Sequence, residues 1–236
     1  MNALPVSASD PDDRSTDARL ESRARMSLGS SSDAIYTMVD EFFQSANLGG
    51  GTLVDVGCGG GGLWRLVSPR FHRYCGLDAV RYDTFPVDGE FRRIDLDSAE
   101  WPVPPGAGDV VVAVETIEHL ENPWAFVRQL SALAKPDGWV LVTTPNQTSV
   151  LSLMTLAIKR RFSAFQDSHF PAHKTALLSS DLERAAREAG LEVVRVVYSR
   201  RGRVPLTGWH FPRALAAVWP RALSDNVMLV SRKRRV

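Results

Sequence analysis

Apolar side chains recur along this chain in two alternating patterns, which predict strands and helices in turn. Short, largely apolar runs predict buried parallel strands, because a strand covered on both faces has no polar side. The predicted strands, with the exit of the third, are residues 53–56, 73–78, 91–97, 109–114, 139–144, 191–198 and 226–231. Between them, apolar residues at helical spacing predict helices, the first of which begins at Asp33. Strands that alternate with helices predict an α/β fold with helices on both faces of a sheet.

Breaker and capping residues set the expected ends of these helices. Residues 49–51 are all glycine and are expected to end the first helix. A later helix is expected to begin after Asn122, with Pro123 in its first position, and to end at residues 136–138. Ser180 and Glu183 have the spacing of a capping box at the start of another helix.

One strand-turn-helix unit organises the chain. Four of the five residues at 57–61 are glycine, and Leu63, Leu66 and Val67 predict a helix directly after them. Glycine permits positive φ and lets a ligand lie on the backbone, while the helix N-terminus presents unpaired N–H groups. An acid, Asp55, precedes the glycines. Its carboxylate would repel a pyrophosphate and attract a cationic amino-acid group, which argues against a dinucleotide.

The spacing Asp55-x-Gly57-x-Gly59-x-Gly61 resembles motif I of the class I S-adenosylmethionine-dependent methyltransferases. In that family the glycine turn carries the methionine part of the cofactor. The resemblance implies S-adenosyl-L-methionine as the cofactor, bound by these four residues and by Cys58, which we expect to be a small filler rather than a nucleophile. It also implies a Rossmann-like, seven-stranded, mostly parallel sheet with helices on both faces, an antiparallel last strand, and a cap or lid.

Two further acids follow predicted strands. Asp78 closes the second strand, where an acid is placed to accept both hydroxyls of a ribose. The alternative for Asp78 is a solvated turn aspartate. In methyltransferases of this type, an acid after the third strand faces the adenine amino group and the next residue packs on the ring. Asp95 and Leu96 match those positions, with Asp97 as the competitor because sequence does not fix the register.

A polar cluster follows the strand at 109–114, at an end where open α/β sheets bind ligands. The run from Glu115 to Leu120, E-T-I-E-H-L, resembles a segment of the ubiquinone-biosynthesis O-methyltransferase type and its relatives. We expect Glu115 to bind the cofactor, and Glu118 and His119 to be catalytic. A hydroxyl acceptor needs a base or a metal to remove its proton, and an imidazole with a pKa of about 6.5 can accept one. The alternative for His119 is a structural role in capping the next helix.

The same resemblance implies a metal site. The ubiquinone-type enzymes and the small-RNA 3′-end 2′-O-methyltransferases use such a set with a distant histidine. Glu115, Glu118 and His119 would bind Mg²⁺ together with His173 or His169. The alternative is a polar loop that only caps a helix.

Composition narrows the class of protein. The chain has 236 residues, enough for one domain with a substantial core, and a formal net charge of +1 gives no global argument for nucleic acid. Its two cysteines, Cys58 and Cys75, form no disulfide framework or zinc spacing. We see no signal peptide and no apolar run of membrane length, so we expect a cytoplasmic enzyme.

Composition also divides the chain. Residues 1–32 are rich in Ser, Asp, Arg and Pro, and we expect a disordered tail before a methyltransferase domain at 33–236, with lid elements around 147–175 and 200–223. The apolar run at 150–158 is followed by three cations at 159–161. It is expected to be a cap helix over the substrate pocket. The alternative is an interfacial segment in peripheral contact with a membrane.

The leading functional hypothesis is methyl transfer from S-adenosylmethionine to a small molecule, with O-methylation of a sugar, lipid-linked or aromatic metabolite. A metal-dependent RNA 2′-O-methyltransferase is an alternative, opposed by the near-neutral charge. A non-catalytic or NAD-dependent nucleotide-binding domain is another, opposed by Asp55 and by the intact polar cluster at 115–119.

Overall fold

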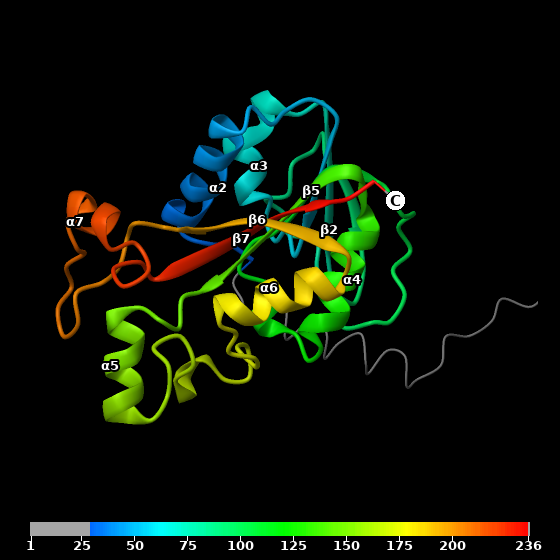
Figure 1. Cartoon of the computed structure of the whole chain (residues 1–236). Helices are drawn as coiled ribbons and strands as arrows, with labels where there is room; N and C mark the ends of the chain where they lie inside the picture. The colour runs from blue at the N-terminus through cyan, green and yellow to red at the C-terminus, as the bar shows by residue number, and fades with distance from the viewer. Residues whose placement is uncertain (1–28, 236) are drawn as a thin grey trace, which may run out of the picture.

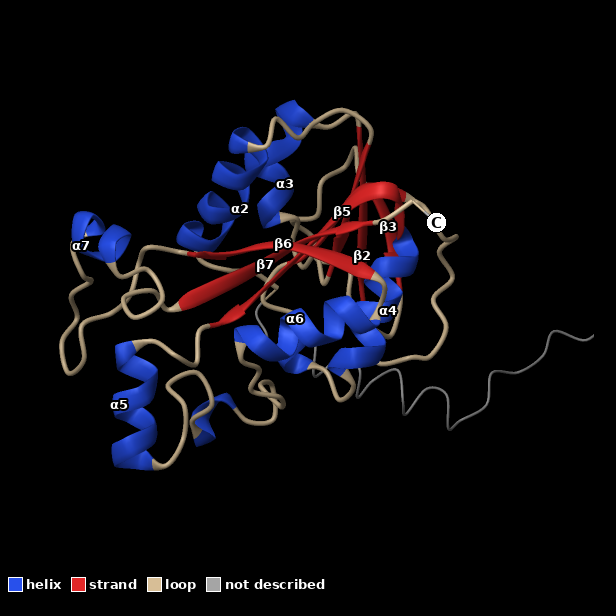
Figure 2. Ribbon diagram, in the orientation of Figure 1, coloured by secondary structure: helices blue, strands red, loops and turns tan. Residues whose placement is uncertain are grey.

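The computed structural model describes residues 29–235 and places seven strands in one sheet, in the order β3-β2-β1-β4-β5-β7-β6 (Figures 1 and 2). The strands are β1 (Thr52–Val56), β2 (Arg73–Asp78), β3 (Glu90–Arg93), β4 (Gly108–Ala113), β5 (Ala134–Pro145), β6 (Leu191–Tyr198) and β7 (Asn226–Lys233). All neighbours are parallel except β7, which runs antiparallel to both β5 and β6. The predicted fold class, including the antiparallel last strand, is confirmed.

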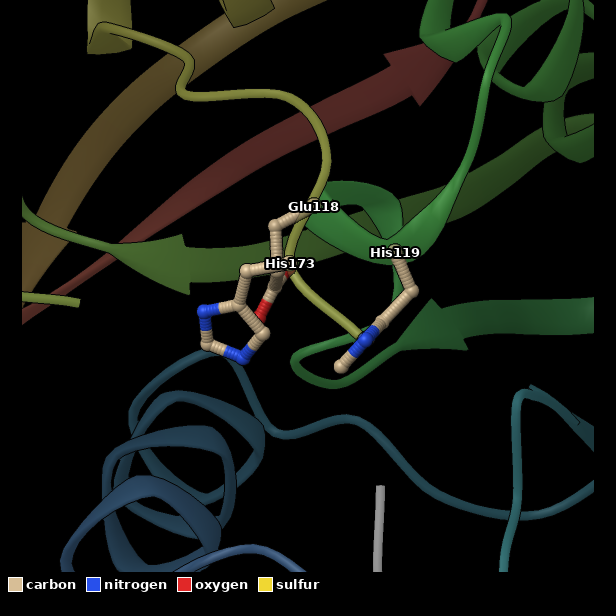
Figure 3. A group of neighbouring side chains, drawn as sticks. All are labelled: Glu118, His119 and His173. Atoms are coloured by element: carbon tan, nitrogen blue, oxygen red, sulfur yellow. The ribbon is translucent and has the colours of Figure 1, made fainter. Parts of the chain in front are cut away.

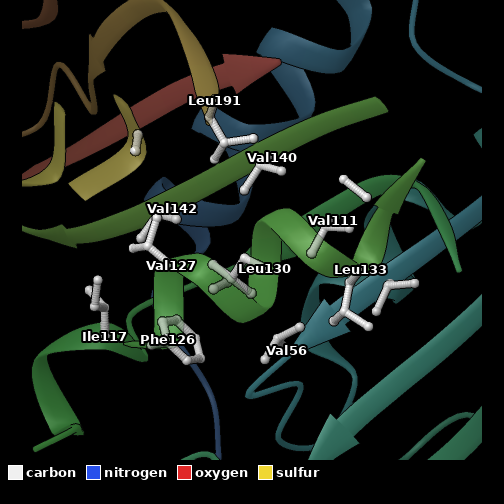
Figure 4. Close-up of a cluster of buried hydrophobic side chains, with 14 of the residues drawn as sticks. Val56, Val111, Ile117, Phe126, Val127, Leu130, Leu133, Val140, Val142 and Leu191 are labelled. Carbon is white, nitrogen blue, oxygen red and sulfur yellow. The ribbon is translucent and has the colours of Figure 1, made fainter. Parts of the chain in front are cut away.

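Helices cover both faces of this sheet (Figure 2). The helices of the described chain are α2 (Asp33–Ser45), α3 (Gly62–Val67), α4 (Pro123–Leu133), α5 (Val150–Lys159), α6 (Ser179–Glu188) and α7 (Arg213–Val218). One buried cluster joins α2 and α3 to the sheet, and a second joins α4 and α6 to it. Figure 4 shows the second cluster, where Phe126 and Leu130 of α4 pack against the buried strands. This two-sided core fixes the strand ends that build the site.

Two helix ends differ from the predictions. Helix α2 ends at Ser45, before the three glycines, because Asn47 already adopts a left-handed conformation (φ 50°) and Leu48 N–H donates to Phe43 O. Helix α4 ends at Leu133, and β5 begins at the next residue rather than at 139. Strand β5 is irregular there, since its register against β4 shifts between Gly108 and Val110.

The prediction of a capping box at Ser180 and Glu183 is wrong, because the helix begins earlier than expected. Helix α6 begins at Ser179, so its N-cap is Leu178 rather than Ser180. The carboxylate of Asp181, at the third helical position, accepts a hydrogen bond from the Leu178 backbone N–H at 3.1 Å. Only the half of the motif that reaches back from the helix is present, because leucine has no side-chain acceptor.

The fold places a ligand site between β1 and β4. From β1 the chain continues outward to β2 and β3 on one side, and then returns to β4 on the other side of β1. An open α/β sheet binds ligands at such a switch point, beyond the carboxyl ends of the strands. The segments predicted as lid elements, 147–175 and 200–223, contain α5 and α7. Of the predicted disordered tail, residues 1–28 lie outside the described residues. No helix within residues 29–235 is long and apolar enough to cross a membrane.

Candidate functional site

A cavity of about 420 Å³ lies at the carboxyl ends of β1, β2 and β4. Its walls come from parts of the chain that are far apart in sequence. These are residues 29–32, the start of α2, the glycine turn, the ends of β2 and β4, the 3₁₀ turn η2 (Ile117–His119), and residues 168–173. Most of the predicted site residues therefore line one cavity.

The glycine turn has no room for side chains. Gly57, Gly59 and Gly61 all have positive φ, at 75°, 49° and 72°. A Cβ at Gly57 would lie 2.2 Å from Thr116 Oγ1, and a Cβ at Gly59 would lie 2.1 Å from Gly29 O. The N–H of Gly60 donates to Gly29 O at 2.9 Å. Glycine is thus required by both conformation and contact, and residues just before α2 lie directly on the turn.

Asp55 is buried at the floor of the cavity. Its Oδ2 accepts a hydrogen bond from the Tyr74 hydroxyl at 2.9 Å. Burial raises the pKa of this carboxyl to about 7, and the Tyr74 hydrogen bond opposes that shift only in part. A cationic group in the cavity would lower the pKa again, because it would stabilise the ionised form.

Cys58 is also buried in the turn, and its sulfur lies close to Gly76 of β2. Burial raises the pKa of its thiol well above the ordinary value. A protonated, enclosed thiol is a weak nucleophile, which agrees with the expected filler role.

Asp78 lies at the end of β2 and lines the cavity beside the glycine turn. Its Oδ2 accepts the Gly59 N–H at 2.8 Å and its Oδ1 accepts the Val80 N–H at 3.3 Å. Burial raises its pKa, while these backbone hydrogen bonds act in the opposite direction. Each carboxylate oxygen can accept more than one hydrogen bond, so Asp78 can hold the turn and still accept from a ligand.

Asp95 and Leu96, the two residues predicted to contact adenine, differ in their positions relative to the cavity. Leu96 lines the cavity, but Asp95 does not. The Oδ1 atom of Asp95 instead accepts the Asp97 N–H at 3.0 Å, which closes a local turn. Asp97 also lies outside the cavity lining, and its Oδ1 accepts the Glu121 N–H. The described geometry thus gives neither acid a place in the cavity wall.

Glu115 lines the cavity, but its carboxylate is already held by protein groups. Its Oε1 accepts from the Thr143 hydroxyl at 2.9 Å and its Oε2 from Asn226 Nδ2 at 2.8 Å. Burial raises its pKa to about 7. Glu115 also has a positive φ of 49°, which turns the chain from β4 into the next segment. Both oxygens point to β5 and β7, so Glu115 is not part of the ligand cluster around His119.

Three side chains form a potential metal cluster in the described chain: Glu118, His119 and His173 (Figure 3). One ligand atom from each lies within 4.8 Å of the others. The His119 and His173 ring centroids are 4.8 Å apart. Glu118 is fully buried and its Oε1 atom has no hydrogen-bond partner. Because buried polar atoms are normally hydrogen-bonded, this oxygen is a candidate ligand atom.

Backbone carbonyls fix the orientation of both imidazoles. His119 Nδ1 lies 2.9 Å from Ala172 O, and His173 Nδ1 lies 2.6 Å from Ala164 O. A carbonyl only accepts, so each neutral ring carries its proton on Nδ1 and its lone pair on Nε2. Burial and the neighbouring His173 lower the pKa of His119 to about 4, and burial also lowers the pKa of His173. Both rings are therefore neutral near pH 7.

The distant histidine is brought in by a second backbone contact. The carbonyl of Glu118 accepts the N–H groups of Lys174 and Thr175, at 2.8 and 3.1 Å. This pairing holds residues 172–175 against η2 although more than 50 positions separate His119 from His173. His169 stacks on His173 and also lines the cavity, but it is not in the three-residue cluster.

Sequence patterns missed several cavity residues. Tyr36 of α2 lines the cavity, and its hydroxyl accepts the Ser31 N–H at 2.9 Å. Gly29 lies on the glycine turn, and Phe170 is an exposed aromatic at the cavity rim. Helical periodicity marks only the core face of α2, and no local motif signals residues 29–32 or 170.

A family model described as "Methyltransferase domain" matches residues 33–196 of this chain. A ubiquinone biosynthesis O-methyltransferase from Chromobacterium violaceum is 29% identical over 164 residues, which cover 65% of this chain and 69% of that protein. A probable S-adenosylmethionine-dependent methyltransferase from Mycolicibacterium smegmatis is 29% identical over 182 residues, 75% of this chain and 66% of that protein. The chain spans about two thirds of the length of these relatives.

A solved structure extends the likeness over nearly the whole chain. The Burkholderia thailandensis 1,6-didemethyltoxoflavin-N1-methyltransferase was solved with 1,6-didemethyltoxoflavin and S-adenosylhomocysteine bound. It matches with a TM-score of 0.63 and 13% identity, covering 98% of this chain and 94% of that one. At this identity the likeness concerns the fold.

Proposed function

This chain belongs to the methyltransferase-domain family and has the fold of S-adenosylmethionine-dependent methyltransferases, and we propose that it methylates an oxygen atom of a small-molecule acceptor. The observation that carries the proposal is one cavity in which an acid-flanked glycine turn faces a Glu-His-His cluster. The turn offers a place for the methyl donor, and the cluster offers groups that can deprotonate an acceptor.

The residues around the turn fit S-adenosylmethionine. Gly57, Cys58 and Gly59 of the turn line the cavity, so a ligand in it would lie against their backbone. The buried carboxyl of Asp55 suits the amino-acid cation, and Asp78 suits a ribose diol. When bound, the cofactor supplies an electrophilic methyl group. The protein contributes position, which alone can lower a barrier by up to about 7–11 kcal/mol in ideal cases.

We propose that His119 acts on the acceptor. Its Nδ1 proton is held by Ala172, so its Nε2 lone pair is available to a hydroxyl proton. The low pKa of His119, about 4, keeps this nitrogen unprotonated at neutral pH but makes it a weak base. A weak base needs an acceptor hydroxyl that is made more acidic, and Glu118 and His173 would contribute to this by holding a metal ion beside it.

We further propose that Glu118, His119 and His173 hold a divalent metal ion. Two Nε2 lone pairs, two Nδ1–H groups fixed by carbonyls and one unpartnered carboxylate oxygen support this. The proposal modifies the Mg²⁺ hypothesis, because two imidazoles and one carboxylate suit transition metals such as Zn²⁺ or Mn²⁺ better than Mg²⁺. Such an ion would act as a Lewis acid toward an acceptor oxygen.

Cofactor affinity is expected to depend on pH through Asp55. Since the cation of the ligand lowers a pKa that stands at about 7 in the free protein, binding requires the ionised carboxyl and releases a proton below pH 7. The dissociation constant of S-adenosylhomocysteine should thus rise by about fivefold when pH falls from about 7 to about 6, and by about tenfold when it falls from about 8 to about 6. Isothermal titration calorimetry at several pH values from 6 to 8 measures the dissociation constant. The same experiment tests the proposed function, because it detects cofactor binding.

Asp55→Asn should weaken binding at pH 8 and abolish the pH dependence. The matched control is Asp137→Asn, the same change at a position that tolerates asparagine at its positive φ of 62° and lies outside the cavity. A wild-type affinity that is flat from pH 6 to 8, or absent altogether, contradicts the assignment of Asp55.

Metal binding is expected to be specific for the three-residue cluster. After dialysis against EDTA, the protein should take up about one equivalent of Zn²⁺ or Mn²⁺ and much less Mg²⁺, measured by equilibrium dialysis and elemental analysis. Glu118→Gln and His173→Ala should each lose this uptake, while His72→Ala, an exposed histidine outside the cavity, should keep it. Equal uptake by all four proteins would rule out a site at the cluster.

A further inference from the structure

We propose that α5, α7 and the loop before α7 form a docking surface for anionic lipid bilayers. The sequence singled out residues 150–161 alone, as a cap helix or an interfacial segment. The structure adds a second apolar helix at the same end of the sheet. This inference is independent of methyl transfer, because lipid binding is measured without catalysis.

The apolar part of this surface is unusually exposed. On α5, Leu153, Met154 and Ile158 are 49%, 40% and 70% exposed. Val218, the last residue of α7, is 66% exposed, and Trp219, directly after it, is 59% exposed. Leu206, Trp209 and Leu215 add three more exposed side chains in the loop and in α7. Most of the large exposed apolar side chains of the described chain therefore lie on these segments, and such concentrations mark interaction sites.

The two helices form one unit at the left of Figure 1, where both project from the same end of the sheet. Hydrogen bonds join their bases. Asn146, just before α5, donates through Nδ2 to the carbonyls of Arg221 and Ser224, at 2.7 and 2.8 Å. The Val150 N–H donates to Ala222 O at 2.8 Å. Because these bonds connect the start of α5 to the segment after α7, the two apolar helices are held together as a platform.

The positive charge of this surface indicates that its partner is anionic. Residues 147–166 and 199–224 contain eight Lys and Arg residues and no Asp or Glu. Since the whole chain has a formal charge of +1, the remainder has −7. Lys159, Arg160 and Arg213 are exposed and form no ion pair with any described residue. Arg161 and Arg203 form ion pairs with Asp167 and Asp225, which lie directly after these ranges, so the net positive charge beside the exposed apolar side chains comes from the other six cations.

Apolar and basic side chains together fit a lipid surface better than a nucleic acid. Aliphatic groups such as Ile158 and Val218 cannot stack on bases, but they can enter the acyl region, while cations contact anionic headgroups. Tryptophan, here Trp209 and Trp219, is favoured at membrane interfaces. The segment after α5 connects it to the cavity, because the Ser163 N–H donates to Ser152 Oγ of α5 and Ala164 O lies 2.6 Å from His173 Nδ1. A bilayer docked here would therefore lie near the entrance to the cavity, where Phe170 is 71% exposed.

The test is vesicle co-sedimentation of the full chain. Vesicles of equimolar phosphatidylglycerol and phosphatidylcholine should bind the protein, vesicles of phosphatidylcholine alone should bind it far less, and added salt should weaken binding. The double variant Lys159→Gln/Arg213→Gln should bind about 30-fold more weakly, and Ile158→Ser/Val218→Ser at least about tenfold more weakly.

Matched controls make comparable changes elsewhere, replacing two exposed cations or two exposed apolar side chains. Arg128→Gln/Arg184→Gln removes two exposed cations from α4 and α6, and Val87→Ser/Val194→Ser removes two exposed valines. Both controls should bind like the wild type. Equal binding to both vesicle types, or equal losses in test and control variants, would overturn the proposal. Tighter binding to poly(U) RNA than to anionic vesicles at the same salt would also overturn it and assign the surface to nucleic acid.

Discussion

Replacing His119 with alanine is expected to lower kcat by about 10²- to 10⁴-fold and to leave the affinity for S-adenosylhomocysteine unchanged. The imidazole lies at the cluster side of the cavity, whereas the cofactor-binding residues that we propose lie on the glycine turn and β2. Its loss removes the proton acceptor, or a metal ligand, without touching Asp55 or Asp78. The rate is measured as S-adenosylhomocysteine formed, with the best acceptor from a screen of hydroxylated aromatic and sugar compounds.

A second histidine separates the two proposed roles of His119. If His119 acts alone as a base, His173→Ala should have a small effect on kcat, because His173 then only packs against the base. If the two histidines share a metal ion, both variants should lose a similar factor, and EDTA should reproduce the loss in the wild type. His72→Ala controls for the loss of an exposed imidazole. Normal turnover by His119→Ala would refute both roles.

Local sequence patterns predicted the part of the site that local geometry determines. The turn at 57–61 needs glycine because of its positive φ angles and its contacts with Thr116 and Gly29, and short strands with acids near their ends gave the positions of Asp55 and Asp78. Each of these features depends on a few neighbouring residues. Periodicity and turn chemistry therefore sufficed to place them at the carboxyl edge of the sheet.

Long-range pairing and side-chain direction set the rest. His173 reaches His119 because residues 174 and 175 bond to the Glu118 carbonyl, which no spacing rule predicts. Asp95 follows the expected strand, but its carboxylate accepts the Asp97 N–H and does not line the cavity. Glu115 fits the E-x-x-E-H pattern, yet Asn226, in a strand more than 100 positions away, holds one of its oxygens. Motif spacing gives the residue types in such cases and leaves their partners open.

Asp78→Ala is expected to weaken S-adenosylhomocysteine binding by about 100-fold, because the variant loses two charge-assisted hydrogen bonds. The effect has two sources in this fold. Asp78 is proposed to accept from the ribose, and its Oδ2 also holds the Gly59 N–H at 2.8 Å, which orders the glycine turn. Calorimetry measures the affinity, and a thermal unfolding scan checks that the variant is folded.

Asp78→Asn separates these two sources, because an amide keeps one acceptor oxygen and loses the charge. If the hydrogen bond to Gly59 dominates, the asparagine variant should bind nearly as well as the wild type. If the ribose contact dominates, it should resemble the alanine variant, since an amide NH₂ cannot accept from a hydroxyl. Asp95→Ala is the matched control, since its carboxylate lies outside the cavity lining, and it should bind normally. Equal losses at positions 78 and 95 would mean that Asp78 has no special place in the cofactor site.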